Sequence, residues 1–201
     1  MILRSGSELL NPFRILERVG VRERMHVADL GCGAIGHFVF PAAQMVGPKG
    51  KVYAVDILKD ALDMLDRRSR EDQYTNIHFV WSDIEVYRAA HIPDHSVDLV
   101  FLVNVLFFVQ RPTHVVAEVS RIVKKGGKVL VIDWKPSATA IGPDTSRRLS
   151  AVEIARYFQG DCFEPLDAFD AGRAHQALVF HRTDAASKVP EHDDADRSRL
   201  A

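Results

Sequence analysis

A glycine-rich turn between two apolar segments constrains this chain more than any other feature. Residues 27–30 have the pattern of a short buried strand, and they lead directly into a turn, 31–36, that contains three glycines. A second apolar segment, 52–55, ends in Asp56. Glycine lets a backbone turn sharply and lets a ligand approach closely. An acid at the end of the second strand suits a bidentate hydrogen bond to a ribose diol. The sequence therefore predicts a site for an adenosine-containing cofactor.

Length and charge balance favour an ordinary globular domain. The chain has 201 residues, of which 47% are hydrophobic and 26% charged, as in typical soluble proteins. Its 26 basic and 27 acidic residues nearly cancel, so we expect no nucleic-acid partner. From residue 183 onward the sequence is charged and poor in apolar residues, a composition typical of disorder. We expect one domain over residues 1–182 and a disordered tail over 183–201.

Cysteine usage and the apolar segments predict a cytoplasmic protein. Cys32 and Cys162 offer neither a disulfide framework nor metal-ligand spacing, so we expect a reducing compartment and no metal site. The N-terminus lacks the apolar core of a signal peptide. The most apolar run, 99–109, is interrupted by Asn104 and is too short to span a bilayer. No transmembrane segment is expected.

Strand and helix patterns alternate along the chain. Strands are predicted at 25–30, 51–55, 77–81, 97–102 and 128–133, and helices at 38–46, 59–70, 112–123 and 150–158. Alternation of this kind implies a parallel sheet with right-handed crossovers. Two further strand patterns, 163–169 and 176–181, have no helix between them and should form an antiparallel hairpin. The fold class is therefore α/β, doubly wound and Rossmann-like, with an antiparallel C-terminal hairpin.

Two cofactors fit the glycine turn. The spacing Gly31-x-Gly33-x-x-Gly36, with Asp56 about 20 residues further on, matches the dinucleotide fingerprint. Asp29, however, stands two residues before the first glycine, where an anion would repel a pyrophosphate and attract an ammonium group. The later strands carry no second nucleotide half-site, and the hairpin does not belong to a dinucleotide fold.

The ordered motifs at 29–33, 52–56, 82–83, 97–100 and 124–127 resemble those of class I S-adenosylmethionine-dependent methyltransferases. The chain is most similar to the small ubiquinone and menaquinone biosynthesis type (methyltransferase type 11), over about residues 11–182. The resemblance implies a mostly parallel seven-stranded sheet and S-adenosylmethionine as the cofactor. One departure is the turn itself, since the family usually has Gly-x-Gly-x-Gly and here two residues separate Gly33 from Gly36.

The resemblance also implies which residues contact the cofactor. Asp29 would orient the methionine ammonium group, and Gly31 and Gly33 would present backbone amides, with Cys32 between them because it is small. Asp56 would hold the ribose hydroxyls.

Three further contacts concern the adenine and the methionine. Ile57 would lie against the adenine ring, and Asp83 and Ile84 would meet its amino group and edge. The backbone at Asn104 would lie near the methionine. No catalytic residue is predicted.

Methyl transfer to a small-molecule acceptor is the leading functional hypothesis, and Phe107 and Phe108 favour an apolar one. A base-binding Asn-Pro-Pro-Tyr segment is absent after the fourth strand, and two cysteines are too few to bind arsenite as thiolates. Two alternatives stay open, a non-catalytic module that binds a nucleoside cofactor and an NAD-dependent oxidoreductase. Side chains that could face the acceptor are His37, His114, Asp133, Trp134, Lys135, Arg147, Arg148 and His175.

Overall fold

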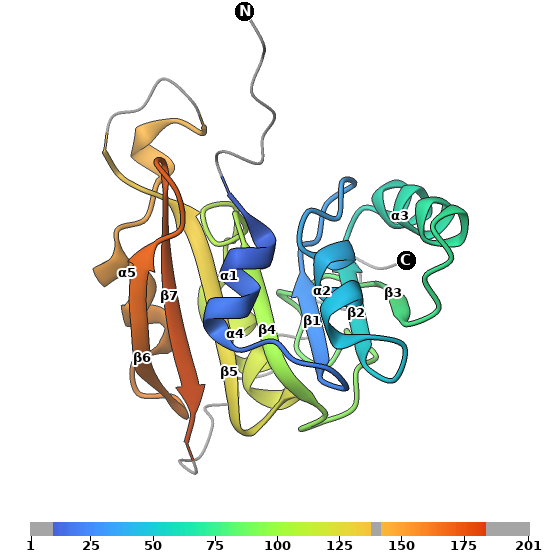
Figure 1. The fold of residues 1–201 in the computed structure, drawn as a ribbon. Helices are drawn as coiled ribbons and strands as arrows, with labels where there is room; N and C mark the ends of the chain where they lie inside the picture. The colour runs from blue at the N-terminus through green and yellow to red at the C-terminus, as the bar shows by residue number, and fades with distance from the viewer. Residues whose placement is uncertain (1–9, 138–141, 184–201) are drawn as a thin grey trace, which may run out of the picture.

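A seven-stranded sheet organises the chain (Figure 1). The computed structural model describes residues 10–137 and 142–183. The strands are β1 (His26–Leu30), β2 (Lys51–Asp56), β3 (Ile77–Trp81), β4 (Val97–Val103), β5 (Val123–Trp134), β6 (Phe163–Asp170) and β7 (His175–Arg182). The helices are α1 (Pro12–Val19), α2 (Val39–Val46), α3 (Lys59–Glu71), α4 (Pro112–Ile122) and α5 (Ala151–Phe158), with a short 3-10 turn at Thr145–Arg147.

The strand order is β3-β2-β1-β4-β5-β7-β6. The first five strands pair in parallel, whereas β7 runs antiparallel to both β5 and β6. This arrangement confirms the predicted fold class, hairpin included. Because the chain leaves β1 toward β3 and then returns to place β4 on the other side of β1, the order reverses between β1 and β4. Open sheets of this kind bind ligands at the carboxyl ends of the strands beside such a reversal.

Side chains on the central strands alternate between two cores, one on each face of the sheet. Leu99 and Phe101 of β4 pack with residues of α1, α2 and α3, whereas Val100 and Leu102 pack with residues of α4 and α5. In Figure 1, α1 and α2 lie in front of the sheet and α4 lies behind it. The buried strands therefore consist of nearly continuous apolar runs, as expected for a sheet covered on both faces.

Local signals account for several helix ends. The side chain of Asn11 accepts a hydrogen bond from the Arg14 amide at the start of α1, and Pro12 occupies the first turn, which suits its fixed φ. Ser150 and Glu153 form a reciprocal capping box at the start of α5. The helices at 12–19 and 151–158, which cover the sheet, thus begin at residues whose side chains cap the helix start.

The structure differs from the sequence prediction at the start of β5. The sequence predicts a helix over 112–123 and a strand from 128, yet Val123 already has extended backbone and pairs with Val97, while the next pair joins Leu99 to Lys128. Residues 124–127 therefore interrupt the pairing of β5 with β4. Within this interruption Gly126 has a φ of 71°, which turns the chain before pairing resumes at Lys128. The connection from β3 to β4 contains turns and no helix in residues 82–96.

The tail predicted at 183–201 lies outside the described residues except for Thr183, whose amide donates to the Cys162 carbonyl at 2.7 Å. The domain boundary at residue 182 stays a prediction. Within the described part of the chain, no helix is long and apolar enough to cross a membrane. The cytoplasmic location also stays a prediction.

Candidate active site

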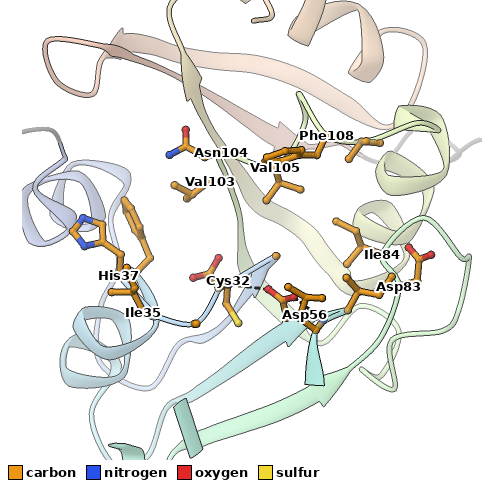
Figure 2. A pocket seen from close by; sticks show the side chains of 18 of the residues that line it. Cys32, Ile35, His37, Asp56, Asp83, Ile84, Val103, Asn104, Val105 and Phe108 are labelled. Atoms are coloured by element: carbon orange, nitrogen blue, oxygen red, sulfur yellow. Dashed lines mark hydrogen bonds between the residues drawn. The ribbon is translucent and has the colours of Figure 1, made fainter. Parts of the chain in front are cut away.

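A cavity of about 1150 Å³ lies at the carboxyl ends of the central strands (Figure 2). All nine predicted cofactor-contact residues line it: Asp29, Gly31, Cys32, Gly33, Asp56, Ile57, Asp83, Ile84 and Asn104. The structure thus brings together side chains from four separate strand ends. Their contacts with a cofactor stay a prediction.

Two backbone amides hold the carboxylate of Asp56. Its Oδ2 accepts a hydrogen bond from the Gly33 amide at 2.8 Å, and its Oδ1 accepts one from the Leu58 amide at 2.9 Å. Figure 2 shows the first of these bonds beside Cys32. Each carboxylate oxygen keeps a further lone pair. A diol could therefore bind without displacing either amide.

Asp29 is buried without compensation. It is 2% exposed, and its Oδ1 has no hydrogen-bond partner among the described residues. Burial, and secondly the negative charge of Asp56, raise the pKa of Asp29 from 3.8 to about 7. A cationic group placed in the cavity would relieve both costs.

Gly31 and Gly33 in the turn after β1 both have a left-handed backbone conformation, but their surroundings differ. Gly31 has a φ of 80°, and a Cβ there would lie 2.5 Å from Val105 Cγ2. Gly33 has a φ of 62° and no heavy atom within 4 Å of its Cβ position. Gly36 packs elsewhere, against Phe40 and Leu65, and does not line the cavity.

The prediction that the turn amides face the cofactor needs correction. The Gly31 and Cys32 amides both donate to the Val55 carbonyl, at 2.8 and 3.0 Å. The Gly33 amide donates to Asp56. These hydrogen bonds hold the turn and the Asp56 carboxylate in place. The glycines therefore contribute space beside the cavity and the backbone conformation of the turn, and their amides are not free to bind a cofactor.

Asp83 and Ile84 follow β3 and lie at one end of the cavity in Figure 2. Asp83 is largely buried, and its Oδ1 accepts the Glu85 amide at 2.8 Å. Trp81, the last residue of β3, does not line the cavity. Its Nε1 donates to the Ile57 carbonyl at 2.9 Å, so it supports the backbone beside the predicted adenine position.

Cys32 is a free, buried cysteine. Burial, followed by the negative charges of Asp29 and Asp56, raises the pKa of its thiol. Because the thiolate is the reactive form, Cys32 is a small spacer in the turn, as the sequence indicated, and is unsuited to act as a nucleophile.

The opposite end of the cavity is apolar and aromatic. His37 and Ile35 lie far from Asp83 in Figure 2, and Val103, Val105 and Phe108 lie along another wall. Leu10, Phe38, Trp134 and His175 also line the cavity.

Of the eight side chains that the sequence offers for contact with the acceptor, five do not line the cavity: His114, Asp133, Lys135, Arg147 and Arg148. Lys135 pairs with Asp170 at 2.8 Å. Arg148 is buried, where its guanidinium donates to the carbonyls of Pro143 and Ser137. These two side chains hold the backbone that follows β5.

Sequence reasoning missed Val105 and Glu85, which both line the cavity. Glu85 Oε2 accepts the Gln110 and Arg111 amides, at 3.0 and 2.6 Å, and so connects the segments after β3 and β4. Its position two residues beyond Asp83, in the segment that follows β3, is the signal that could have identified it.

The cavity is acidic. Asp29, Asp56, Asp83 and Glu85 line it, and of the described residues no lysine or arginine does. A pyrophosphate would meet repulsion from this lining, whereas a cationic cofactor would be attracted. Among the described residues there is also no group of three histidine, cysteine or acidic side chains placed to hold a metal ion.

The sheet order, with the antiparallel β7 inserted between β5 and β6, is that of the class I S-adenosylmethionine-dependent methyltransferase fold. The sequence family described as "Methyltransferase domain" matches residues 22–163. The chain belongs to this family, is of the type 11 kind, and has S-adenosylmethionine as its cofactor, as the sequence resemblance predicted. The NAD-dependent alternative is thereby set aside.

Three relatives illustrate the match. A ubiquinone/menaquinone biosynthesis C-methyltransferase from Hahella chejuensis is 31% identical over 124 residues, which cover 61% of this chain and 48% of the relative. A tRNA N(3)-cytidine methyltransferase from Gallus gallus is 31% identical over 111 residues, covering 54% and 30%. The crystal structure of a SAM-dependent methyltransferase from Aquifex aeolicus has a TM-score of 0.83 at 24% identity, covering 89% of this chain and 93% of that one. The chain spans about half the length, or less, of these curated relatives. Because one of them acts on tRNA, the expected absence of a nucleic-acid partner stays a prediction.

Proposed function

We propose that this chain transfers a methyl group from S-adenosylmethionine to a small, apolar acceptor. The observation that carries the proposal is the acidic cavity, in which Asp29 is buried beside Asp56 with no cationic side chain of the described residues to compensate either. S-adenosylmethionine supplies an electrophilic methyl group on a positively charged sulfonium, and it also carries an ammonium group. Its charges are the complement of this lining.

The chain's own residues would bind and align the reactants. Asp29 would hold the ammonium group, which would keep its carboxylate ionised. Asp56, fixed by the Gly33 and Leu58 amides, would accept both ribose hydroxyls, and Ile57 and Ile84 would cover the adenine. Holding two reactants in line contributes roughly 7–11 kcal/mol of barrier reduction in well-oriented systems. Alignment and water exclusion are therefore sufficient tasks for the protein.

An apolar acceptor is supported by the apolar residues of the cavity lining, which include Val103, Val105, Phe38, Phe108 and Trp134. The relatives named as ubiquinone, menaquinone and demethylmenaquinone methyltransferases are consistent with an aromatic acceptor. A tRNA acceptor, which the Gallus gallus relative raises, is disfavoured by the four carboxylates that line the cavity, because they would repel nucleic-acid phosphates.

Calorimetry with S-adenosylhomocysteine, the demethylated product, tests the cofactor half of the proposal. We expect the wild-type chain to bind it and Asp56→Asn to bind it about 10- to 100-fold more weakly, because hydrogen bonds to a charged acceptor are lost. Asp63→Asn is the matched control, since Asp63 is exposed on α3. The cofactor assignment fails if the wild-type chain does not bind, or if both variants bind equally well.

A second measurement separates an enzyme from a binding module. The chain is incubated with methyl-labelled S-adenosylmethionine, and label transfer is followed to a mixture of apolar aromatic metabolites and, separately, to bulk tRNA. Transfer to the small molecules supports the proposal. Transfer to tRNA alone replaces the acceptor class, and binding without transfer to either favours the non-catalytic module.

A further inference from the structure

His175 is a buried histidine with neither ring nitrogen satisfied. It is the first residue of β7, is 1% exposed, and lines the cavity. Neither Nδ1 nor Nε2 has a hydrogen-bond partner among the described residues. Buried polar groups in folded proteins are nearly always paired, so an imidazole with two free nitrogens at a cavity wall indicates a ligand that supplies the partner.

The surroundings of His175 fix its ring. Trp134, the last residue of β5, pairs with His175 in the antiparallel register, and their ring centroids are 4.1 Å apart. The guanidinium of Arg148 lies 5.8 Å from the Trp134 ring and donates to the Pro143 carbonyl at 3.0 Å. The two rings therefore form a firm aromatic wall at the end of β5 and β7.

The strand order places this wall beyond the cofactor. The predicted ribose and ammonium contacts, Asp56 and Asp29, come from β2 and β1, and Asn104 follows β4. The next strands along the sheet are β5 and β7. A ligand that lies over β2, β1 and β4 leaves the part of the cavity over β5 and β7 for the acceptor.

The charge state of His175 suits a neutral hydrogen-bonding role. Burial, followed by the positive charges of Arg148 and Lys135, lowers the pKa of His175 from 6.5 to about 4. The ring is thus neutral near pH 7, with one nitrogen that accepts and one that donates. The other histidine that lines the cavity, His37, has its Nε2 3.1 Å from the Leu10 carbonyl oxygen, so His175 is the lining histidine whose two ring nitrogens both lack a partner among the described residues.

We propose that His175 is the hydrogen-bonding residue of the acceptor subsite, and that the acceptor is an aromatic ring bearing a hydroxyl group. The ring stacks against Trp134, and its hydroxyl donates to the free imidazole nitrogen. This inference rests on the proposed function, because it assigns the acceptor end of the same cavity.

The test uses two probes of the same shape, 1-naphthol and 1-methylnaphthalene, which differ by a hydroxyl in place of a methyl group. Calorimetry is done with the chain saturated with S-adenosylhomocysteine and placed in the syringe, because both probes dissolve sparingly. Wild type should prefer 1-naphthol about tenfold, the effect expected of one hydrogen bond to a buried neutral partner. His175→Phe should lose this preference, and His175→Gln, which keeps a donor and an acceptor, should retain part of it. His78→Phe, on the exposed edge of β3, should behave as wild type.

Nitrogen NMR of the His175 ring gives a readout that a structural role would not move. 1-Naphthol should shift one ring nitrogen, and 1-methylnaphthalene should leave both unchanged. Equal affinity for the two probes, including no binding of either, or an unchanged nitrogen signal, overturns the inference while S-adenosylhomocysteine binding remains intact. If the wild-type chain does not bind S-adenosylhomocysteine, the proposed function is overturned, and the inference is overturned with it.

Discussion

At the scale of the residue, Asp29 has the environment least like that of an ordinary carboxylate. It is buried beside a second acid, and its folded-state pKa of about 7 lies well above 3.8. A carboxylate at this position destabilises the empty protein, since burial without a counter-charge is costly. The same cost favours a cationic ligand, so a liability for folding becomes a source of binding free energy.

The pH dependence of stability follows from that shift. Between about pH 4 and pH 7 the folded chain keeps a proton on Asp29 that the unfolded chain has lost, so the free energy of unfolding falls as the pH rises through this window. Asp29→Asn abolishes the titration. Relative to wild type, this variant should gain about 2–3 kcal/mol of stability between pH 5 and pH 8. Urea unfolding at the two pH values measures the gap.

Asp63→Asn provides the comparison, because Asp63 is exposed on α3 and should show the same gap from wild type at both pH values. A pH-independent gap for Asp29→Asn would show that the Asp29 carboxylate is compensated in the folded chain.

At the scale of the element, the turn between β1 and α2 combines conformation and close packing. Gly31 and Gly33 both have positive φ values, but a Cβ would meet Val105 Cγ2 only at Gly31. Val105 comes from the segment after β4, so the turn is held by tertiary packing as well as by its own backbone. The third glycine, Gly36, packs against Phe40 and Leu65 and has no part in the cavity.

We therefore expect alanine substitutions at Gly31 and Gly33 to lower the free energy of unfolding by different amounts. Gly33→Ala should destabilise the chain by about 1–2 kcal/mol, the cost of a left-handed conformation for a residue with a Cβ. Gly31→Ala should cost a further 1–3 kcal/mol or so, because its methyl group overlaps Val105. Urea unfolding of the two variants compares them, and Val105→Ala in the Gly31→Ala background should recover part of the difference. Equal costs would mean that the segment after β4 moves away freely.

At the scale of the whole molecule, the width of the sheet sets the distance between the two ends of the cavity. Asp56 ends β2 and His175 begins β7, and three strands lie between β2 and β7 in the sheet order. With strands about 4.8 Å apart, the two backbone positions are roughly 19 Å from each other. A cofactor and an acceptor can thus be held by separate residues on one continuous floor.

Effects of substitutions at these two positions should be independent. Residues more than 7–10 Å apart with no shared partner usually act additively. The double variant Asp56→Asn/His175→Phe should bind S-adenosylhomocysteine as weakly as Asp56→Asn alone, and at saturating S-adenosylhomocysteine it should bind 1-naphthol as weakly as His175→Phe alone. Calorimetry of the four chains tests this, and a coupling larger than about tenfold would indicate that one ligand position spans both residues.

Much of the fold could be predicted because its signals are local. Apolar runs mark the strands of a covered sheet, and Gly31, Gly33 and Asp56 are close enough in the sequence for their spacing to indicate an adenosine-containing cofactor. The start of β5 could not be predicted in this way. Lys124 to Gly127 have the composition of a helix end, and only the pairing of Val123 with Val97 makes them part of a strand.

By itself the sequence determined the order of the elements and the fold class, since periodicity depends on neighbours along the chain. The cofactor followed from the ordered motifs between residues 29 and 127, which resemble those of the methyltransferase family, because the glycine-acid spacing alone also fits NAD. The tertiary structure alone decided which amides are satisfied within the turn, which acid is left without a counter-charge, and which of the candidate side chains line the cavity. His175 was one of eight candidate side chains in the sequence, and nothing local distinguished it. Its burial, its contact with the Trp134 ring and the lack of a partner for either ring nitrogen among the described residues arise from strands brought together by folding, because burial and hydrogen-bond satisfaction are properties of the whole packed molecule.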